Sequence, residues 1–576
     1  MIHSEFSVMG SSITRAAKLC ILLLAVVVVA GASTVTVPTP APVIFFTDLT
    51  SGPNSGGESI SGFAGAYVTI YGNNFGATQG SSTITWNGLN CLRVVSWGQQ
   101  WQWYQKIVAQ LGSSCTPGAG NFVVTVNGQA STSDTSHGDT GASFTVRTTG
   151  NIYCVSTTGN DSNSGKFPNC WASIPYAVHG GTTVAGDVIY VENGVQQTTQ
   201  DTYNASVALI NSGGGTPSMP LALVAYPGAT VTVGSSSTSY GFFFPAIGGY
   251  SGNNWTIAGI TTIGVTAFAL NWYDGVRLIA NDASCPNGDG STACVQSDGG
   301  THYRLYGNNV HNAGNSSSIK TYHAIYWSTT GNHTWMGWNT VANVLGCRGI
   351  QFYAYTSPDM YDLHVHDNVI HDVRCDAINF STVNPDAGTV EAYNNVMYNV
   401  GTGPNPIDGE AVYACFDVNA YTAHTAAVKI YNNTCMNAGF SGSNNSGTLN
   451  AFAPTALNNN LILQLNGQPY VVSGTGCSAL TSSTNNNFFG SSGAPSCGSG
   501  LTGSLSVDPQ VVSTSAPDLH LLNGSRMIAA GNAALFPLYD HAGLVRPTPP
   551  SVGAYEFAAG LVTRPNPPTN LTVVVN

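Results

Sequence analysis

Short runs of alternating apolar and polar residues, punctuated by Gly and Asn, recur through residues 303–437. Five of them are YRLYGNNVHNAG, HTWMGWNTVANV, YDLHVHDNVIHDV, TVEAYNNVMYNV and AVKIYNNTCMNAG, and we mark the repeat by Asn309, Asn339, Asn368, Asn395 and Asn433. These asparagines are 30, 29, 27 and 38 residues apart. A period of this size, carrying strands with little helical patterning, is typical of a stacked solenoid. We therefore expect the asparagines to form internal amide ladders that satisfy the turns.

A companion set of strands follows the same period, and its alternation separates an inner face from an outer face. The pattern predicts inward side chains at Val295, Ile325, Ile350, Ile378 and Val412. It predicts an outward ladder of candidate substrate-binding residues at Gln296, Tyr326, Gln351, Asn379 and Tyr413. Amides and phenols in a row can hydrogen-bond to sugar rings and stack on them. Such residues also occur on solenoid faces that bind nothing, and the sequence leaves both interpretations open.

Ionisable residues open four of these companion strands, namely His323, Arg348, Asp376 and Glu410. Only 7% of the 576 residues are charged, so four ionisable residues on one edge are more than the composition would place there by chance. Two longer loops, residues 314–322 and 401–409, end at the same edge and bring Lys320 and Asp408 to it. A base with nearby cations or bound Ca²⁺ can remove a proton next to a carboxylate and stabilise the resulting carbanion. We therefore take His323, Arg348, Lys320, Asp376 and Glu410 as candidate catalytic residues for a uronate lyase reaction.

Other interpretations of this edge stay open. Arg348, Asp376 and Glu410 could form an ion-pair ladder that only fixes the register of the coils. Asp376 and Glu410, on adjacent coils, could also satisfy the carboxylate spacing of a glycoside hydrolase. The histidines elsewhere are scattered and do not predict a metal site, and they are His302, His311, His364, His366 and His371.

Composition and the N-terminus bear on localisation and partners. The net charge of −12 provides no basic field for a nucleic acid, so we expect no nucleic-acid partner. Arg15 and Lys18 precede an apolar run at residues 19–30 and a small-residue exit, which predicts a signal peptide over residues 1–32. That run is shorter than a membrane span, and no later stretch is long enough for one. We expect a secreted or cell-surface monomer with no membrane span after cleavage.

Twelve cysteines remain once Cys20 is removed with the predicted signal peptide. An even number in an exported chain favours disulfides over metal ligands. Pairing of sequence neighbours is geometrically economical, although the sequence does not prove it. It gives Cys91–Cys115, Cys154–Cys170, Cys285–Cys294, Cys347–Cys375, Cys415–Cys435 and Cys477–Cys497.

Residues 43–147, which follow a Pro-rich linker at 33–42, carry short strands with Gly and Asn turns. The segments are AYVTIYGNNFG, SSTITWNG, NFVVTVNGQAS and SFTVR, and their spacing predicts an antiparallel sandwich. Their order resembles the IPT/TIG immunoglobulin-like domain, which implies a spacer or a contact module. Trp97, Trp101 and Trp103 could form a carbohydrate platform, but we favour packing for them.

Both ends of the region 151–557 resemble right-handed parallel β-helix proteins of the pectate-lyase-like superfamily. The opening is YCVSTTGNDSNSG followed by CWASIPYAVHGGTTVAGDVIYVENG, in which SIPYAV predicts a short capping helix. The closing segments are SVDPQVV, DLHLLNGSRMIAAGN and DHAGLVRPTPPSVGAYEF, and they depart from the usual pattern at Arg526, Ala529 and Ser551. The resemblance implies an end-capped β-helix. It also implies a Lys, Arg or His base in a lyase, but no catalytic motif of the family matches.

The sequence thus predicts an all-β chain: a right-handed parallel β-helix after an immunoglobulin-like β-sandwich, with residues 558–576 as a C-terminal linker or the start of a truncated fibronectin-like module. The function we favour is a secreted carbohydrate-active protein that acts on or binds an extracellular acidic polysaccharide, with Ca²⁺ as a candidate cofactor. A non-catalytic surface, adhesion or glycan-binding protein is the alternative from a different class. A glycoside hydrolase is the further alternative.

Overall fold

A computed structural model describes residues 40–558, except 136–140, 180–181, 201–204, 212, 246–252, 356–359, 411, 420, 422, 444–445, 475 and 491–501. The predicted signal peptide, most of the linker and the C-terminal segment from 559 lie outside the described residues. Residues 41–558 belong to one compact unit. None of the helices in the described part of the chain is both long and apolar enough to span a membrane.

The N-terminal region is a β-sandwich of two sheets, as predicted. The first sheet has the order β5-β6-β3-β1-β9, with β1 (Val43–Thr47), β3 (Tyr67–Asn73), β5 (Leu92–Trp101), β6 (Tyr104–Leu111) and β9 (Thr132–Ser133). The second has the order β2-β10-β7-β4, with β2 (Ser51–Pro53), β4 (Thr83–Trp86), β7 (Gly118–Val126), β10 (Ser143–Arg147), and β8 (Gln129–Ala130) paired to β7. The pairings β3–β6, β1–β3, β4–β7 and β7–β10 are antiparallel.

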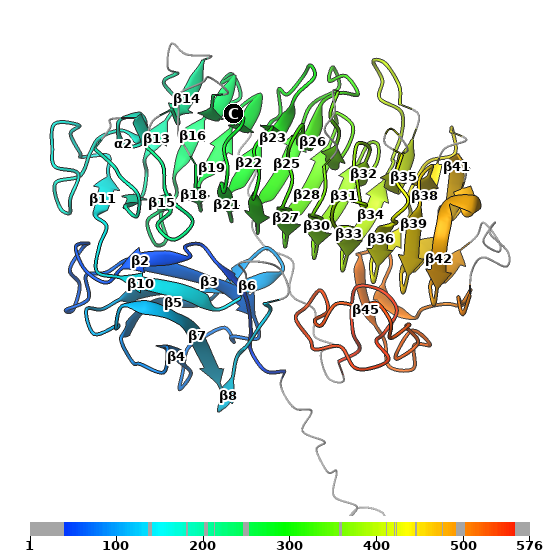
Figure 1. Cartoon of the computed structure of the whole chain (residues 1–576), viewed down its shortest axis with the longest axis horizontal. Coiled ribbons are helices and arrows are strands. Elements are labelled where there is room, and N and C mark those ends of the chain that lie inside the picture. The colour runs from blue at the N-terminus through cyan, green and yellow to red at the C-terminus, as the bar shows by residue number, and fades with distance from the viewer. Residues whose placement is uncertain are drawn as a thin grey trace, which may run out of the picture. The chain divides into compact units, whose positions relative to one another are not determined.

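The rest of the chain coils into a right-handed parallel β-helix, so the predicted fold class is confirmed (Figure 1). Sheet I contains, in stacking order, β11 (Ile152–Val155), β12 (Val188–Val191), β15 (Leu221–Ala225), β18 (Trp255–Ala258), β21 (Arg277–Ile279), β24 (Arg304–Tyr306), β27 (Thr334–Gly337), β30 (Leu363–His366), β33 (Val390–Tyr393), β36 (Val428–Tyr431), β39 (Thr455–Asn458) and β42 (Leu480–Thr484).

Sheets II and III complete each coil. Sheet II contains β13 (Gln196–Gln197), β16 (Thr232–Gly234), β19 (Thr261–Ile263), β22 (Asp282–Ser284), β25 (Asn309–Ala313), β28 (Thr340–Val344), β31 (Val369–Val373), β34 (Val396–Val400), β37 (Thr434–Met436), β40 (Leu461–Gln464) and β43 (Asn487–Gly490). Sheet III contains β14 (Ser206–Leu209), β17 (Tyr240–Phe244), β20 (Thr266–Leu270), β23 (Ala293–Asp298), β26 (His323–Ser328), β29 (Ile350–Phe352), β32 (Ile378–Phe380), β35 (Tyr413–Val418), β38 (Ser446–Ala451) and β41 (Val471–Gly474).

Local elements close the solenoid. The helix α2 (Ile174–His179) buries Ile174, Ala177 and Val178 against the first coils, as the predicted capping helix requires. The 3-10 helix η1 (Gly476–Ala479) follows β41. The terminal segment contains β44 (Val511–Ser513) and β45 (Asp518–Leu521), and its apolar residues pack on the outside of the last coils. The end cap therefore forms despite its departures from the usual pattern.

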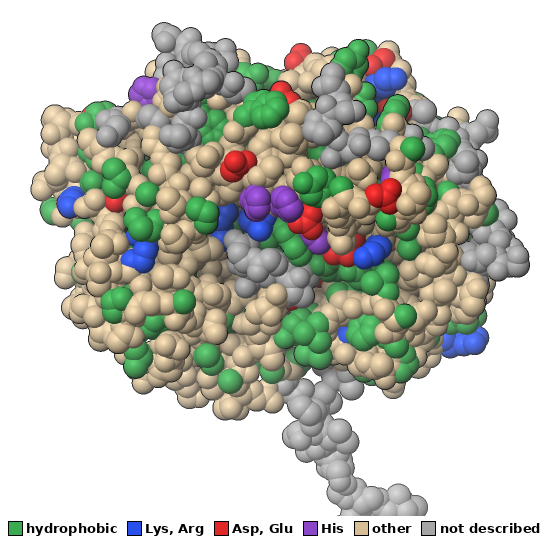
Figure 2. Space-filling model, viewed as in Figure 1, with side chains coloured by type: hydrophobic (Ala, Val, Ile, Leu, Met, Phe, Trp, Pro, Cys, Tyr) green, Lys and Arg blue, Asp and Glu red, His purple; other side chains and the backbone are tan. Residues whose placement is uncertain are grey.

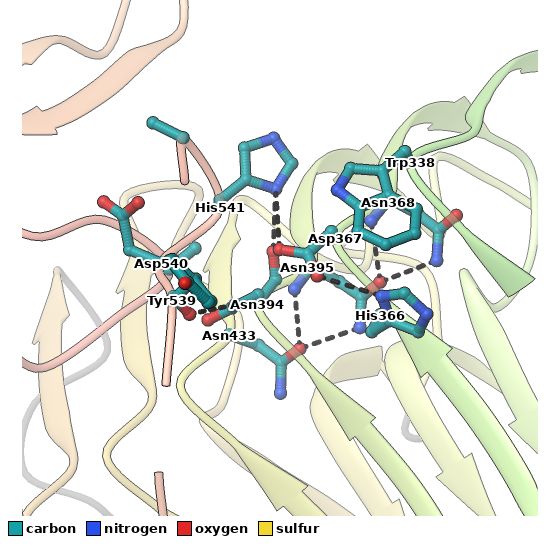
Figure 3. A network of polar contacts seen from close by, with 12 residues as sticks. Trp338, His366, Asp367, Asn368, Asn394, Asn395, Asn433, Tyr539, Asp540 and His541 are labelled. Carbon is teal, nitrogen blue, oxygen red and sulfur yellow. Dashed lines mark hydrogen bonds and ion pairs between the residues drawn. The ribbon is translucent and has the colours of Figure 1, made fainter. Parts of the chain in front are cut away.

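An asparagine ladder runs through the turn between sheets I and II. Each side-chain oxygen accepts from the backbone N–H and the amide of the previous asparagine, at 2.8–3.1 Å, and Figure 3 shows three consecutive members. The predicted ladder is confirmed, with one correction: it passes through Asn308, not Asn309. Its members among the described residues are Asn281, Asn308, Asn339, Asn368, Asn395, Asn433, Asn460 and Asn486.

The residue before each ladder asparagine has a positive φ, between 51° and 68°. Gly, Asn and Asp adopt this conformation most easily, which explains the recurring Gly-Asn, Asp-Asn and Asn-Asn pairs. Trp338 is a bulky exception at φ 55°. Its ring is fully buried and stacks on Phe45 of the sandwich at 5.4 Å, so tertiary packing compensates for the strained backbone.

The tryptophans of the sandwich also pack, as we favoured. Trp97 donates to the carbonyl of Phe75 within the sandwich. Trp101 donates to the carbonyl of Gly307 in the β-helix, at 2.8 Å. Trp103 stacks on His541 of the terminal segment, with ring centroids 4.0 Å apart. These rings are engaged by the chain itself, which argues against a carbohydrate platform.

Five of the six predicted disulfides are present, with Cα–Cα distances of 4.8–6.5 Å: Cys91–Cys115, Cys154–Cys170, Cys285–Cys294, Cys347–Cys375 and Cys415–Cys435. Cys477 is also disulfide-bonded. Its predicted partner, Cys497, lies outside the described residues. Disulfides are typical of proteins that reside in an oxidising compartment.

The neighbours Asn308 and Asn309 test the ladder. Asn308→Ala should lower the free energy of unfolding by about 3 kcal/mol, because it leaves several buried polar groups of adjacent coils without partners. Asn309 is half-buried, and its side-chain amide donates to the carboxylate of Asp282, so Asn309→Ala should cost about 1 kcal/mol or less. Chemical denaturation of both variants measures the difference. Equal costs would contradict the corrected ladder.

Candidate functional site

The predicted charged edge of sheet III exists as a buried network centred on Arg348. Its guanidinium donates to Asp376 Oδ2 at 3.0 Å and to Glu410 Oε2 at 2.8 Å. The side chains of Arg348, Asp376 and Glu410 are 12%, 0% and 10% exposed. Burial raises the pKa of Asp376, and Arg348 partly opposes that shift. Burial lowers the pKa of Arg348, but the carboxylates of Asp376, Glu410 and Asp417 together outweigh burial and raise it.

His323 lies against this network but is buried, and it accepts a 3.4 Å hydrogen bond from the backbone N–H of Arg348. Burial, and then the charge of Arg348, lower the pKa of His323 well below its usual range. Such a histidine is neutral and a weak base. The arrangement therefore favours the structural alternative, in which the ion pairs fix the coils.

The two loops at this edge meet, as expected. The backbone N–H of Lys320 donates to Asp408 at 2.9 Å, and Asn405 donates to the carbonyls of Ser318 and Gly346. Lys320 is half-buried. These contacts tie the loops to one another and to the strands beneath them.

The predicted outward ladder requires two corrections. First, the fifth position is Asp417, not Tyr413, because β32 pairs with β35 through Ile378 and Phe416, and Asn379 faces Asp417. Phe416 likewise takes the inward position predicted for Val412, whereas Val295, Ile325, Ile350 and Ile378 do lie in the core. The long 401–412 insertion displaced the alignment by four residues.

Second, the ladder does not present its side chains to solvent along its length. Gln296 and Tyr326 are half-buried, but Gln351, Asn379 and Asp417 are buried. Asn379 donates to Asp417 at 2.5 Å, and Asn450 of the next coil donates to it at 2.6 Å. Burial raises the pKa of Asp417 to about 6, while Arg348 and these amides oppose the shift. The sequence interpretation missed Asp417 and Asn450, and both belong to a covered polar column.

A second constellation lies on the outer face of sheet I, where the sequence interpretation expected only scattered histidines. Register pairs one outward residue from each of five successive strands, and two further residues precede β27 and β30. We call this set the sheet I site: Arg304, His333, Trp335, Asp362, His364, Glu391 and Lys429. In Figure 2 basic, histidine and acidic side chains gather in a row on the face turned to the viewer, over these strands.

A chain of short hydrogen bonds joins the centre of the sheet I site. His333 Nδ1 is 2.6 Å from Asp362 Oδ2, and His364 Nε2 is 2.9 Å from Asp362 Oδ1. His364 Nδ1 is 2.7 Å from Glu391 Oε1. Trp335 stacks on His364 with centroids 3.6 Å apart, which fixes the ring. One imidazole therefore bridges two carboxylates, and Asp362 holds a second imidazole.

The pKa shifts follow from these bonds. Hydrogen bonds from His364 and then His333 lower the pKa of Asp362 to about 2, although burial opposes them. Burial lowers the pKa of His364, but its bonds to Asp362 and Glu391 dominate and raise it. Burial, His333 and Arg304 lower the pKa of His302, which stacks on His333 at 4.7 Å. The site thus keeps Asp362 ionised and favours a protonated His364.

The site is half-open. The side chains of His333 and Asp362 are 36% and 33% exposed, whereas those of His364 and Glu391 are 8% and 13% exposed. Arg304 donates to the carbonyl of His333 at 2.9 Å, which places its cation beside that histidine. The repeat itself carried a signal for this site, because Arg304, Trp335, His364, Glu391 and Lys429 each stand four residues before a ladder asparagine.

Comparisons with known proteins match a family model to the sandwich and align the chain with several solved structures. The IPT/TIG domain model matches residues 58–140. No curated protein matches the chain. Among solved structures, pectate lyase Pel9A aligns at 15% identity and a TM-score of 0.38, over 70% of this chain and 96% of that one. A complex of XylC with xylose aligns at 10% identity and a TM-score of 0.43, over 71% and 98%. An alginate lyase from Paenibacillus sp. str. FPU-7 aligns at 13% identity and a TM-score of 0.33, over 54% and 93%.

The structural interpretation of the Arg348 network is testable. Arg348→Met should lower the free energy of unfolding by about 3–5 kcal/mol, because it leaves two largely buried carboxylates uncompensated. The triple variant Arg348→Met, Asp376→Asn, Glu410→Gln should recover much of that loss. Differential scanning calorimetry at several pH values measures both.

The pH dependence has a definite sign. Asp376 already has a raised pKa, and loss of Arg348 removes the interaction that lowers it, so protonation stabilises the single variant. The deficit of Arg348→Met should therefore shrink as the pH falls from 8 to 5. If Arg348→Met lowers the free energy of unfolding only slightly, and by the same amount at every pH, then Arg348 does not stabilise the charges of Asp376 and Glu410.

Proposed function

We propose that the protein is an exported, lyase-like enzyme that acts on an acidic polysaccharide, and that Arg304, His333 and Asp362 of the sheet I site form its reacting centre. The observation that supports this most directly is the half-exposed His333–Asp362 pair with Arg304 beside it. The base and the cation of the uronate lyase reaction thus lie on the accessible outer face of sheet I, and not at the buried edge of sheet III where the sequence placed them. His323 and Arg348 then stabilise the scaffold.

His333 suits the role of the general base. Its Nδ1 lies 2.6 Å from a carboxylate that is held ionised, so Nδ1 carries the proton and Nε2 carries the lone pair. No partner for Nε2 is found among the described residues. Asp362 fixes the tautomer and stabilises the imidazolium that forms when Nε2 accepts a proton.

The neighbouring cation completes the requirements of a β-elimination. His333 removes the proton from C5 of a uronate, the C5–H electron pair forms the C4–C5 double bond, and the C4–O bond to the leaving sugar breaks. The leaving oxygen takes up a proton from solvent or from the imidazolium. Arg304 can pair with the uronate carboxylate and stabilise the charge that develops on it.

Glycoside hydrolysis fits the site less well. It needs one carboxyl group with a raised pKa as the acid and one ionised carboxylate as the base or nucleophile. The pKa of Asp362 is instead lowered to about 2, and Glu391 is engaged by His364 and Tyr431. Asp376 and Glu410, the other candidate pair, are committed to Arg348.

We keep Ca²⁺ as a candidate cofactor of the reaction. Calcium takes 6–8 oxygen ligands. Among the described residues the one cluster with metal-ligand spacing is Cys154, Cys170 and Glu192, and its two sulfurs are joined in a disulfide. The mechanism therefore uses no step through calcium, and added Ca²⁺ is retained as a variable in the assay.

Export is part of the proposal. Five disulfides, together with the predicted signal peptide, support a secreted or cell-surface protein. An extracellular polysaccharide is accessible to such a protein, and the low charge of the chain makes the concentration of ionisable groups at the sheet I site distinctive.

The experiment is incubation of the full chain with acidic and neutral polysaccharides, with and without Ca²⁺, while unsaturated-product absorbance and reducing ends are followed together. We expect both signals to rise with an acidic substrate. His333→Gln should lower kcat/KM by about 10²–10⁴-fold, because it removes the base.

His371→Gln is the matched control, since His371 also pairs with a carboxylate, Asp372, at 2.7 Å, but on β31 of sheet II. That variant should keep its activity within about twofold of the native protein. Reducing ends without unsaturation would replace the lyase with a hydrolase. Binding across the panel without any turnover would support the adhesion alternative and overturn the enzyme.

A further inference from the structure

A pocket of ≈ 450 Å³ opens where the sheet I site ends. Its floor comes from sheet I, including Lys429 of β36, Asn458 of β39, and Ser482 and Thr484 of β42. The terminal segment contributes Asn532, Ala534 and Leu535 to the wall. The volume lies within the range of small-ligand pockets, about 300–1,000 Å³.

Lys429 is the one ionisable side chain among the residues that line this pocket. Glu391 is its neighbour in register across β33 and β36. However, Glu391 accepts from His364 at 2.7 Å and from Tyr431 at 3.1 Å, and no ion pair joins it to Lys429. Within the described part of the chain, the Lys429 ammonium has no hydrogen-bond or ion-pair partner. A half-buried, unpaired cation at a pocket favours an anionic ligand.

The remaining polar groups of the pocket are neutral and already organised. Thr484 donates to Asn458 at 2.7 Å, and Asn532 donates to Thr484 at 3.1 Å. Small apolar side chains complete the lining, and they include Ala426, Ala427 and Ala456. One cation, several hydroxyl and amide groups and small apolar walls match a sugar ring that carries a single carboxylate.

The wall from the terminal segment is held in place rather than loosely apposed. Asn459 accepts from the backbone N–H of Asn532 at 2.6 Å, and its amide donates to the carbonyls of Asn532 and Leu535 at 3.0 Å. Asn532 in turn accepts from the N–H of Ala534 at 2.8 Å. A pocket with fixed walls binds without a large ordering cost.

We infer that this pocket is a distal subsite for one uronate unit of the polysaccharide, with its carboxylate paired to Lys429. Three strand spacings separate the coils of His333 and Lys429, about 14 Å. The unit in the pocket is therefore not the unit that reacts, and a chain that spans both positions is bound in one register. This inference rests on the proposed function, because it takes the acidic polysaccharide from it.

The test is calorimetric binding of defined oligosaccharides of galacturonic, mannuronic and guluronic acid, each beside its neutral methyl ester. His333→Gln serves as the background, so that turnover does not consume the ligand. When Lys429→Met is introduced into this background, it should weaken the binding of one acidic oligosaccharide by about tenfold. The binding of the methyl ester of that oligosaccharide should stay almost unchanged. Ala534→Trp, at an exposed wall position, should weaken both forms by filling the pocket.

Lys166→Met is the matched control, because Lys166 is exposed on a loop and donates to Asn151. It should bind like the background protein. Binding unchanged by Lys429→Met, or weakened equally for acid and ester, would overturn the uronate subsite even if the native protein is an active lyase. A carboxylate-specific loss in a protein without turnover would support the subsite and remove only the catalytic part of the proposed function.

Discussion

Vertical hydrogen bonding between buried asparagines is the constraint on which the β-helix depends. A solenoid must satisfy the backbone N–H groups at each turn, and water does not reach them in the interior. Here each asparagine oxygen satisfies the N–H of the ladder asparagine one coil before it, while its amide donates to a main-chain carbonyl. The bonds permit only one vertical alignment of coils, because a slip of one residue would turn every strand face over. The asparagine ladder therefore also sets which residues of successive strands lie above one another in the three sheets.

That register distributes the few charges of the chain into two different environments. On sheet III, Arg348 and its carboxylates are largely buried, and their mutual attraction offsets the cost of removing charges from water. On sheet I, Asp362 and His333 keep about a third of their surfaces exposed. Both clusters contain histidine, acid and arginine side chains. Exposure, not composition, therefore decides which of them can meet a substrate.

Much of the fold was predictable because the signals are local or periodic. The repeat period was predicted from spacing, four of the five inward positions from alternation, and five cysteine pairs from the economy of pairing sequence neighbours. The fifth position failed at a long insertion, where the count placed Tyr413 opposite Asn379, although backbone pairing selects Asp417. Nothing in the local sequence measures how much of residues 401–412 forms a loop and how much forms a strand.

The candidate site was harder to predict for a different reason. Its members stand four residues before each ladder asparagine, so the repeat contained the signal. The repeat was marked by Asn309, although the ladder residue is Asn308. Four residues before Asn309 is Leu305, which faces the core, so that marker leaves Arg304 out of the sheet I site. Burial was equally beyond the sequence: it made His323 an inaccessible neutral side chain while leaving His333 open. Composition identifies which ionisable residues are candidates for a site, but the packing of the folded chain decides which of them are accessible to a substrate.

The same turn that sets the register also shapes the subsite proposed at the end of the row. Asn459 occupies the positive-φ position that precedes the ladder residue Asn460. Because its backbone turns there, its side chain points away from the ladder and holds the terminal segment at Asn532 and Leu535. Asn394 and Asn432 hold later parts of that segment from equivalent positions, and Figure 3 shows the former beside Tyr539. The positions that let the coils turn therefore also dock the cap, and the cap supplies the wall that converts an open sheet face into a pocket beside Lys429.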